Sequence, residues 1–408
     1  MLTRSCKRET WGVRDLEHHR FHVLVWHFLR LLLRSWMRRK FRYAFAPVDT
    51  AGPCLVVANH VTDWDPLLVG CAFPRQMYFV ASEHIFRWGF RSRLIRWLLN
   101  PIPRLKGCTA TDTAFAILRR LKHGASVCLF AEGNRCWDGL TEPIHATTGR
   151  LVRASGATLV TFRLEGGYLT SPRWAGKNLR RGQMQGRVAG VYAPAELRVM
   201  PPEEITRLIE RDLREDAWAR QREEPVAYRG ENLAEHLERL LCLCPACRRV
   251  GKLHSAGDYV RCDCGLTARY TEYGYFDGDA LPYDNLLDWT RWQDTELCAL
   301  FDAHARGPFL TDTNITLSEI LPGHEKQDFG TGTLSLYHDR LTWDNMVLPF
   351  PAVTGVSLLS SQTMELGFGR KHFEFGSGKV RCLRKYMTLL QYAKSQPRRP
   401  GDVIAAGR

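Results

Sequence analysis

The sequence predicts an α/β fold with a largely parallel sheet, followed by a small cysteine-rich module and a mainly β C-terminal domain. Three observations support this organisation. Apolar runs alternate with helical patterns over residues 46–225, which is typical of a largely parallel sheet. Two close pairs of cysteines follow within residues 241–277, and strand-like segments dominate residues 309–375. A chain of 408 residues is also expected to form more than one domain.

The first predicted element is a basic amphipathic helix within the N-terminal segment 1–45. Its apolar core from Phe21 to Leu33 has 13 residues and includes His27 and Arg30, whereas crossing a bilayer takes about 20 apolar residues. We therefore expect this helix to lie in a membrane interface, where its basic residues contact anionic lipids and its tryptophans suit the headgroup region. The alternative is packing on its own domain, and one helix can do both.

Strand and helix patterns then alternate through the segment 46–225. The predicted strands are residues 54–58, 76–80, 126–130, 157–164 and 187–192. The predicted helices begin at residue 66, cover residues 85–99, run from residue 111 or 112 to about 123, and run from residue 202 to about 222. Residues 226–240 are predicted to be a helical linker. In such sheets, sites form at the carboxyl ends of strands.

One polar turn follows the strand at residues 54–58 and contains His60 and, five positions later, Asp65. A histidine with a pKa near 6.5 is suited to taking a proton from a hydroxyl group, and a carboxylate fixes the tautomer of such a base. No serine or cysteine lies close in sequence as an obvious nucleophile. This favours direct attack by an acceptor hydroxyl on an activated acyl group such as a thioester. The alternative for Asp65 is a cap on the helix that begins at Pro66.

A second polar turn, Glu132-Gly133-Asn134-Arg135, follows the strand at residues 126–130. An arginine offers two parallel hydrogen bonds to a phosphate, and a glycine lets backbone N–H groups approach an anion. We expect this turn to supply anion contacts in the same pocket as His60. The alternatives are a solvated loop arginine and a structural ion pair of Glu132.

Together, these two turns resemble the blocks of the 1-acylglycerol-3-phosphate acyltransferases, the PlsC-like glycerolipid acyltransferase family. Members carry Asn-His-x4-Asp, a basic block and Phe-Pro-Glu-Gly-Thr-Arg-Ser at comparable spacing, and the resemblance covers about residues 20–225. Residues 101–107 correspond to the basic block. The departures are Ala131, Asn134 and Cys136 in the third block and the absence of a proline from residues 159–164.

The resemblance implies catalytic roles for His60 as base and Asp65 as its orienting partner. It implies that the acceptor is bound by Asn59, Arg104 or Lys106, Glu132, Gly133, Asn134 and Arg135. The expected reaction moves a fatty acyl group from acyl-CoA or acyl carrier protein to the free hydroxyl of lysophosphatidate, making phosphatidic acid for phospholipid synthesis. The alternatives are another lysolipid or lipid hydroxyl as acceptor, and a catalytically inactive membrane-bound adaptor.

Charge is unevenly distributed along the chain. The net charge is +14, and residues 1–240 hold 38 Lys and Arg against 24 Asp and Glu, whereas residues 241–277 hold five against four. Nucleic-acid binding needs clustered Lys and Arg, so the cysteine-rich module is not expected to bind nucleic acid. A polar first segment and 13 scattered cysteines favour a reducing compartment, and we expect the protein on the cytoplasmic side of a membrane.

Four of the cysteines, Cys244, Cys247, Cys262 and Cys264, form two pairs that resemble a zinc ribbon. Four thiolates suit a tetrahedral structural Zn²⁺ site. The second pair has one intervening residue where two are usual, and Cys242 could replace one of the four as a ligand. Redox activity and packing in the core are two further explanations for these cysteines.

Residues 278–395 are predicted to form a mainly β domain that resembles pleckstrin-homology-like or GRAM-like domains. The prediction rests on a series of strands followed by one closing helix at residues 380–394. Residues 281–300 are interpreted as a connector, and the tail 396–408, rich in proline and arginine, is expected to be disordered.

Overall fold

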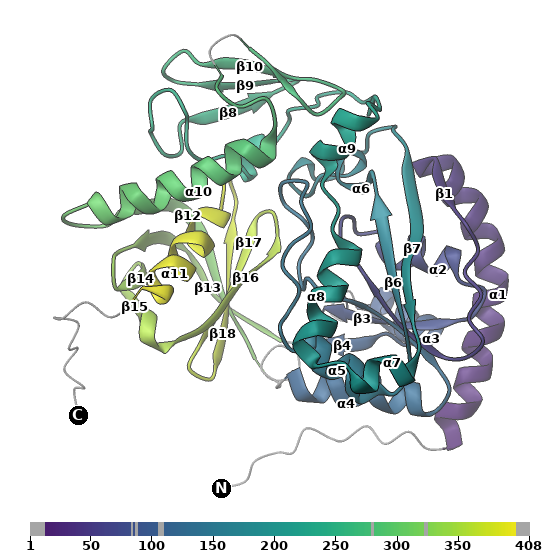
Figure 1. Ribbon diagram of the computed structural model, residues 1–408. Coiled ribbons are helices and arrows are strands. Elements are labelled where there is room, and N and C mark those ends of the chain that lie inside the picture. Colours follow the sequence, from purple (N-terminus) through teal and green to yellow (C-terminus); the bar gives the residue numbers. More distant parts are fainter. Residues whose placement is uncertain are drawn as a thin grey trace, which may run out of the picture.

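The computed structural model describes residues 13–82, 85, 89–104, 110–278, 281–321 and 325–396, with side chains from residue 19 onward except those of residues 82 and 110. Figure 1 shows an α/β domain with helix α1 along its outer edge, a small module beside one end of it, and a C-terminal sheet. Helix α10 (Leu286–Ala303) runs between the module and the C-terminal sheet. The predicted Lys106 and most of the predicted tail lie outside the described residues.

A seven-stranded sheet forms the centre of the α/β domain, in the order β1-β7-β6-β2-β5-β3-β4. Its strands are β1 (Tyr43–Phe45), β2 (Cys54–Ala58), β3 (Met77–Ser82), β4 (Ile102–Arg104), β5 (Ser126–Phe130), β6 (Thr158–Glu165) and β7 (Met184–Tyr192). Every neighbouring pair is parallel except β6 and β7. The predicted largely parallel sheet is therefore confirmed, and the ends of β2 and β5 lie at one edge.

Both faces of this sheet are covered, because alternate side chains of each strand point to opposite sides. Leu55 and Val57 belong to one buried cluster, whereas Val56 and Ala58 belong to the other. Helices α4, α5 and α8 contribute to the first cluster, and α1 and α2 to the second. These helices are α1 (Val13–Phe41), α2 (Asp65–Ala72), α4 (Ala110–Lys122), α5 (Thr148–Ser155) and α8 (Pro202–Leu213).

Two predicted helices differ in extent from the structure. Helix α3 (Phe90–Leu99) begins later than residue 85, directly after Gly89, which has a positive φ of 58°. The predicted helix from residue 202 to about 222 is divided into α8 and α9 (Ala217–Glu223). The second helix starts afresh because the side chain of Asp216 accepts hydrogen bonds from the backbone N–H groups of Trp218 and Ala219.

The prediction of a helical linker at residues 226–240 is wrong. The segment forms turns and one short 3-10 helix, η3 (Leu237–Arg239). Asn232 and His236 have positive φ values of 54° and 72°, which a continuous right-handed helix does not allow. Leu233, Leu237 and neighbouring apolar side chains are buried, so this segment packs against the rest of the molecule.

The cysteine-rich module is an antiparallel sheet of four short strands in the order β11-β10-β9-β8. The strands are β8 (Leu253–Ala256), β9 (Tyr259–Cys262), β10 (Thr267–Tyr270) and β11 (Phe276–Asp277). Helix α10 follows it where the sequence indicated a connector. The buried positions of α10 include Trp289, Leu297 and Phe301, so this helix forms part of the core.

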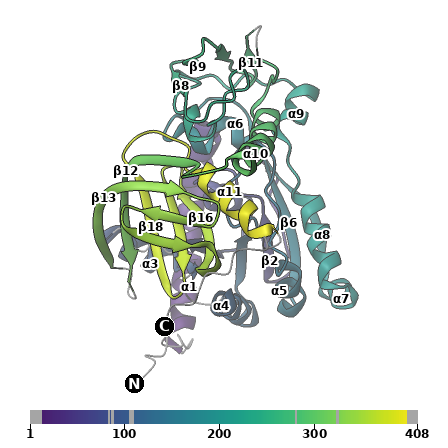
Figure 2. The same ribbon diagram turned by 90° about the vertical axis from the view of Figure 1, so that its left-hand side faces the viewer.

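The C-terminal domain is a seven-stranded antiparallel sheet in the order β15-β14-β13-β12-β18-β17-β16. Its strands are β12 (Leu310–Ile320), β13 (Lys326–Leu336), β14 (Arg340–Trp343), β15 (Met346–Pro349), β16 (Val353–Ser360), β17 (Thr363–Phe368) and β18 (Lys371–Ser377). Helix α11 (Arg384–Ser395) packs on it through buried residues such as Tyr386 and Leu389, and Figure 2 shows this helix beside the sheet. The prediction of a mainly β domain followed by a closing helix is confirmed.

Candidate functional site

His60 lies at the carboxyl end of β2, with its ring positioned by two neighbours. Its Nδ1 is 2.7 Å from Oδ2 of Asp65, and its ring stacks on Phe130 with 4.5 Å between centroids. The side chain is 23% exposed. Among the described residues Nε2 has no hydrogen-bond partner, so it is the ring atom available to a bound molecule.

Asp65 is completely buried and faces back into the turn. Its carboxylate accepts hydrogen bonds from the backbone N–H groups of Val61 and Thr62 and from the Thr62 hydroxyl, in addition to the contact with His60. Asp65 is the first residue of α2, and the residue at the N-cap position is Trp64. Its side chain therefore orients His60 and the turn, and it does not cap the helix.

Glu132 connects the second turn to the first. Its Oε1 accepts a hydrogen bond of 2.6 Å from the backbone N–H of His60, and its Oε2 accepts one of 2.8 Å from the backbone N–H of Glu142. Desolvation raises the pKa of Glu132 well above its usual range, and the two N–H groups oppose that shift. The prediction of Glu132 as a substrate contact is therefore corrected, because both its carboxylate oxygens bind the backbone of the site.

Asn59 also differs from its predicted role. Its side chain amide donates to the backbone carbonyl of Leu164 and accepts from the backbone N–H of the same residue. The residue is 1% exposed. Asn59 therefore joins the ends of β2 and β6, and its buried side chain is not exposed to a bound acyl acceptor.

The basic residues of the two remaining blocks lie beside these turns. Gly133 has a φ of +73°, and a Cβ atom placed on it would lie 3.0 Å from Nη1 of Arg104, so that guanidinium lies against the glycine. Arg135 forms an ion pair of 3.1 Å with Asp63, whose side chain is 79% exposed. The backbone N–H of Cys136 also donates to the His60 carbonyl over 2.9 Å. The structure therefore brings the two turns and Arg104 to one place.

Arg173 is a further residue of this region that the sequence reasoning missed. It lies in η2 (Arg173–Ala175), is 4% exposed, and donates from Nη1 to the carbonyl of Arg135 over 3.2 Å. Burial, and next the nearby Arg135, lower its pKa to about 9. No sequence motif marks Arg173, because its partners are 38 and 185 residues away.

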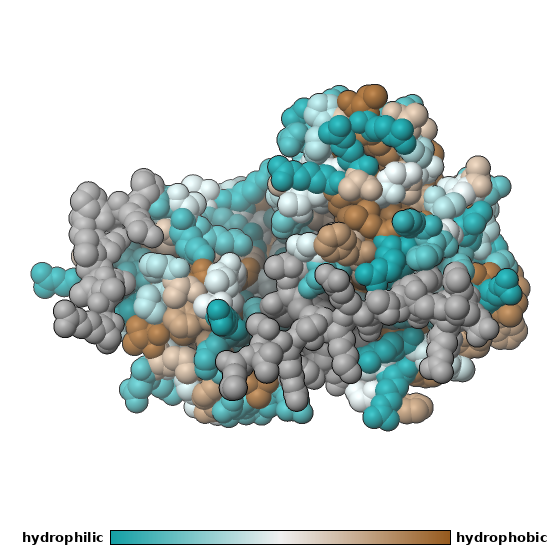
Figure 3. Space-filling model, turned by 90° about the horizontal axis from the view of Figure 1, so that it is seen from below, coloured by the Kyte–Doolittle hydropathy of each residue, from teal (hydrophilic) through white to brown (hydrophobic). Residues whose placement is uncertain are grey.

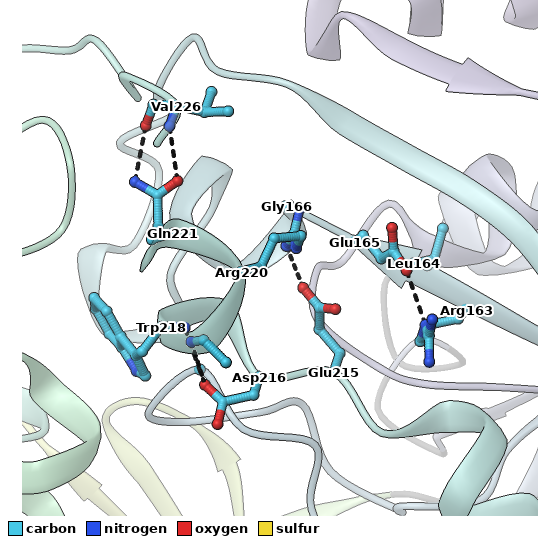
Figure 4. A network of polar contacts seen from close by, with 12 residues as sticks. Arg163, Leu164, Glu165, Gly166, Glu215, Asp216, Trp218, Arg220, Gln221 and Val226 are labelled. Carbon is cyan, nitrogen blue, oxygen red and sulfur yellow. Dashed lines mark hydrogen bonds and ion pairs between the residues drawn. The ribbon is translucent and has the colours of Figure 1, made fainter. Parts of the chain in front are cut away.

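The loop after Arg135 is held by the start of α9. The Gly139 carbonyl accepts from the backbone N–H of Ala217, and the Asp138 carbonyl accepts from the indole N–H of Trp218. Figure 4 shows the surrounding polar network, in which Glu215 pairs with Arg220 and the side chain of Gln221 binds the backbone of Val226. The hydrogen bonds from Ala217 and Trp218 therefore fix the loop against α9.

Acidic groups in this loop are desolvated. Burial raises the pKa of Glu142 to about 7, with Asp138 as the next cause and Arg384 and Arg173 acting in the opposite direction. Burial also raises the pKa of Asp138. The loop therefore contains a carboxyl group that changes charge near neutral pH.

The four cysteines of the module converge as the sequence predicts. Their sulfur atoms all lie within 4.8 Å of one another, with 3.7 Å between Cys244 and Cys264 and 3.8 Å between Cys247 and Cys262. Tetrahedral Zn–S bonds of about 2.3 Å place two sulfurs roughly 3.8 Å apart, so the donor set fits this metal. Cys242 is buried near Cys382 and does not belong to the cluster.

Helix α1 carries an exposed apolar face. Leu24, Phe28, Leu31 and Leu32 are 60–71% exposed, and they recur at helical spacing. On the neighbouring helix α3, Phe90, Leu94 and Trp97 are also exposed, and the Trp97 ring lies 5.0 Å from that of Phe21. Figure 3 shows hydrophobic and hydrophilic side chains mixed at the edge where Figure 1 places α1.

The same helix contacts the turn of His60 and Asp65 at its other end. Trp64, which stands directly before Asp65, packs on Trp36 and Phe41 of α1 with ring centroids 5.2 and 5.9 Å apart. The ammonium of Lys40 lies 4.2 Å from the centroid of the Trp64 ring. Within the described part of the chain, none of the helices combines the length and the apolar character that crossing a membrane requires.

Comparisons with known proteins agree with the site. The family model described as Acyltransferase matches residues 40–165, whereas a comparison with curated proteins gives no match. The solved 1-acyl-sn-glycerophosphate (LPA) acyltransferase PlsC from Thermotoga maritima is 17% identical, with a TM-score of 0.37, over 49% of this chain and 94% of its own. The N-terminal PH domain of human ARAP2 is 13% identical, with a TM-score of 0.17, over 24% of this chain and 97% of its own.

TM-scores this low do not establish a shared fold with either structure. The assignment depends on the family model, which includes His60, Asp65 and the turn at residues 132–135. The acyltransferase family indicated by the two motifs is thereby confirmed for this part of the chain. Residues 40–165, within the α/β domain, belong to an acyltransferase domain.

Proposed function

We propose that this chain transfers a fatty acyl group from an acyl-CoA or acyl carrier protein thioester to the free hydroxyl of 1-acyl-sn-glycerol-3-phosphate. The observation that carries the proposal is the junction of the two turns, where His60 and Arg135 meet through Glu132, Asp63 and Cys136. The residues assigned as base and as anion contact therefore lie at one edge of one sheet. The product is phosphatidic acid.

In the proposed mechanism, Nε2 of His60 accepts the proton of the acceptor hydroxyl. The hydroxyl oxygen forms a bond to the thioester carbonyl carbon, the C–S bond breaks, and the proton passes from His60 to the leaving thiolate. Asp65 holds Nδ1 as the protonated nitrogen and stabilises the imidazolium. A positioned base of this kind contributes roughly 10²–10⁴-fold in rate.

The acceptor phosphate is assigned to the guanidinium groups of Arg135 and Arg104, with the backbone of Gly133 and Asn134. Asp63 is mostly exposed and holds Arg135 through a single ion pair, so a phosphate with two acceptor oxygens can replace it. An acceptor without phosphate would use neither arginine. This difference separates acceptors that carry a phosphate, such as lysophosphatidate, from lipid hydroxyls without one.

The test is acyl transfer from labelled acyl-CoA to lysophosphatidate by purified wild type, His60→Ala and Asp65→Asn. We expect losses of roughly 10²–10⁴-fold for His60→Ala and a loss of similar size for Asp65→Asn, because an amide no longer fixes the tautomer of His60. His254→Ala, at an exposed histidine of the module, is the matched control. Equal rates for wild type and His60→Ala would reject the mechanism.

Acceptor identity is tested with Arg135→Gln. If lysophosphatidate is the acceptor, its KM rises by roughly tenfold or more, because a charged hydrogen bond contributes about 1.5–3 kcal/mol. If KM for the preferred acceptor is unchanged, the substrate is a lipid hydroxyl without phosphate. Absence of transfer to every acceptor would instead favour a membrane-bound adaptor.

We propose a membrane surface as the site of action, on its cytoplasmic side. Support comes from the exposed apolar side chains of α1 and α3 and from the basic residues that flank them, including Arg30, Arg34 and Arg38. Exposed apolar area and positive charge on one helix suit an interface with anionic lipid. The proposed acceptor is itself a lipid and suits the same interface.

We propose that the four-cysteine cluster holds one structural Zn²⁺. Support comes from the sulfur separations, and from Arg249, which donates to Sγ of Cys247 and lowers the pKa of that thiol to about 6. A site closed by four thiolates leaves no position for a water molecule, so the ion would stabilise the module and take no part in acyl transfer.

We also propose that the C-terminal domain is pleckstrin-homology-like. Support comes from its seven antiparallel strands and the single helix that follows them.

A further inference from the structure

Arg173 joins the acyltransferase domain to the C-terminal sheet. Its Nη1 donates to the carbonyl of Arg135, and its Nη2 donates over 2.7 Å to the carbonyl of Leu358 in β16. The guanidinium also lies 4.2 Å from the centroid of the Trp137 ring. One buried side chain therefore contacts the anion-binding turn and a strand that lies 185 residues further along the chain.

We propose that Arg173 is a positioning residue through which the C-terminal sheet holds the Arg135 loop in place, so that acceptor binding requires the C-terminal domain. The inference rests on the proposed function of Arg135 as a phosphate contact. It assigns to the C-terminal half a part in substrate binding. Arg173 itself is too buried to meet the substrate.

The chemistry of arginine suits this position. The N–H donors of a guanidinium point in different directions within one rigid plane, and the face of that plane can stack on an indole ring. A lysine ammonium is a compact point charge. Burying an arginine is costly unless its donors are satisfied, and the two carbonyls and Trp137 provide that compensation. Nε has no hydrogen-bond partner in the described part of the molecule, so the two Nη contacts carry the connection.

A second contact from the C-terminal half reaches the same loop. The hydroxyl of Thr290 in α10 lies 3.2 Å from Oδ2 of Asp138 and 3.0 Å from the carbonyl of Leu287, and it shares its one proton between these two acceptors. Helix α10 is in turn joined to α11 by Arg384, which donates to both carboxylate oxygens of Asp294 over 2.7 and 2.6 Å. The loop is therefore held at Arg135 through β16 and at Asp138 through α10.

This arrangement explains how the loop at residues 132–142 is held in one conformation, although its glycines allow the backbone more freedom. Its polar backbone groups are paired with segments that are far away in sequence. Loss of the Arg173 contact frees the Arg135 carbonyl and leaves the Leu358 carbonyl buried without its donor. The guanidinium of Arg135 would then sample more positions, which weakens binding of the phosphate and leaves His60 in place.

The experiment compares full-length Arg173→Met with Arg180→Met. Arg180 is an equally buried arginine that donates to the Leu233 carbonyl and lies over the Trp174 and Tyr270 rings, so these side-chain contacts lie outside the loop at residues 132–142. Two quantities are measured: amide hydrogen exchange of residues 133–142, and KM and kcat for lysophosphatidate. Thermal unfolding of both variants reports the general cost of losing a buried arginine.

For Arg173→Met we expect exchange in residues 133–142 to rise by roughly tenfold or more, since a lost charged hydrogen bond contributes about 1.5–3 kcal/mol. KM for lysophosphatidate should rise by a similar factor, and kcat should change little. Arg180→Met should leave both quantities near wild type. Equal exchange in this loop for the two variants, or a fall in kcat with unchanged KM, overturns the proposal.

Hydrogen exchange separates this inference from the proposed function. If the wild type acylates no lysolipid, the proposed function fails, yet exchange still reports whether Arg173 holds the loop. If Arg173→Met does not fold, Arg173→Lys keeps the charge but its ammonium cannot bind both carbonyls, and faster exchange at residues 133–142 is again expected. Unchanged exchange in Arg173→Lys would then count against the inference.

Discussion

Asp65 shows how a buried carboxylate can hold a histidine ring in one orientation. It is completely buried, and it accepts hydrogen bonds from the His60 ring, two backbone N–H groups and a hydroxyl. These donors compensate for the desolvation of a charge. Since Nδ1 of His60 is committed to Asp65, Nε2 is the atom that can accept a proton.

At the residue scale we predict a specific pH dependence of stability at Glu142. Burial raises the pKa of its carboxyl group to about 7 in the folded protein, whereas the group ionises near 4.5 when unfolded. The folded state therefore binds the extra proton, and the free energy of unfolding falls as pH rises through the window between these values. Glu142→Gln should remove part of this fall, on the order of 1–3 kcal/mol between about pH 5 and 7.

Urea unfolding of wild type and Glu142→Gln at several pH values measures this difference. Glu203→Gln, at an exposed glutamate in the first turn of α8, is the control and should follow the wild type. Parallel curves for wild type and Glu142→Gln would contradict the prediction.

Local spacing explains which site residues could be predicted from the sequence. His60 and Asp65 lie within one turn, so their contact follows from five positions of separation. Asn59 and Glu132 were assigned to the acceptor because a motif cannot show that their polar atoms bind backbone groups. Arg173 could not be found, because both of its partners come from other elements.

At the scale of elements, α1 combines two tasks on different faces. Trp26, Met37 and Phe41 are buried against the domain, whereas Leu24 and Phe28 are about 70% exposed. The sequence interpretations of a membrane-surface helix and of a helix packed on its own domain therefore describe different faces of one helix. The packed face is a finding, and the membrane-surface role stays a proposal.

We predict that the exposed face of α1 drives association with anionic vesicles. Changing Leu24, Phe28 and Leu31 to glutamine together should reduce partitioning by more than roughly 100-fold, because burial of each side chain contributes about 1.5–3 kcal/mol. Vesicle co-sedimentation measures this effect. Val199→Gln with Val347→Gln, at exposed apolar residues on other elements, is the control, and equal losses in both variants would sink the prediction.

Element boundaries were predicted where periodicity and end signals agree. The strands at residues 54–58 and 126–130 match β2 and β5 because they are short apolar runs before polar turns. The helical linker at residues 226–240 was wrong because Leu233, Leu237 and Leu240 recur at helical spacing, whereas the positive φ values of Asn232 and His236 interrupt a helix there. Helix α10 was missed because its tryptophans, charges and leucines are mixed along residues 286–303.

At the scale of the whole molecule, the cysteine-rich module packs on the acyltransferase domain. The Tyr270 ring lies 5.8 Å from that of Trp174, and the backbone N–H of Tyr228 donates to the carbonyl of Glu272. The module is also joined to α10, since the indole N–H of Trp289 donates to the Leu243 carbonyl. Unfolding of the module should therefore destabilise both larger domains.

We predict that the purified protein contains one Zn²⁺ per chain and that Cys247→Ser greatly weakens its binding. Four-thiolate sites contribute about 10–16 kcal/mol of apparent binding free energy in small modules, so a chelator should lower the midpoint of thermal unfolding. Metal analysis and calorimetry measure both effects. Cys298→Ser, at a thiol outside the cluster, is the control; a metal-free wild type that zinc does not stabilise would contradict the prediction.

The join between α1 and β1 limits how the active site can move. One residue, Arg42, with a positive φ of 47°, separates α1 from β1, which pairs with β7 in the central sheet. Trp64, directly before Asp65, is stacked on the same helix. If α1 lies on lipid, it cannot rotate relative to the central sheet, and the His60 ring stays at a constant distance from the headgroups.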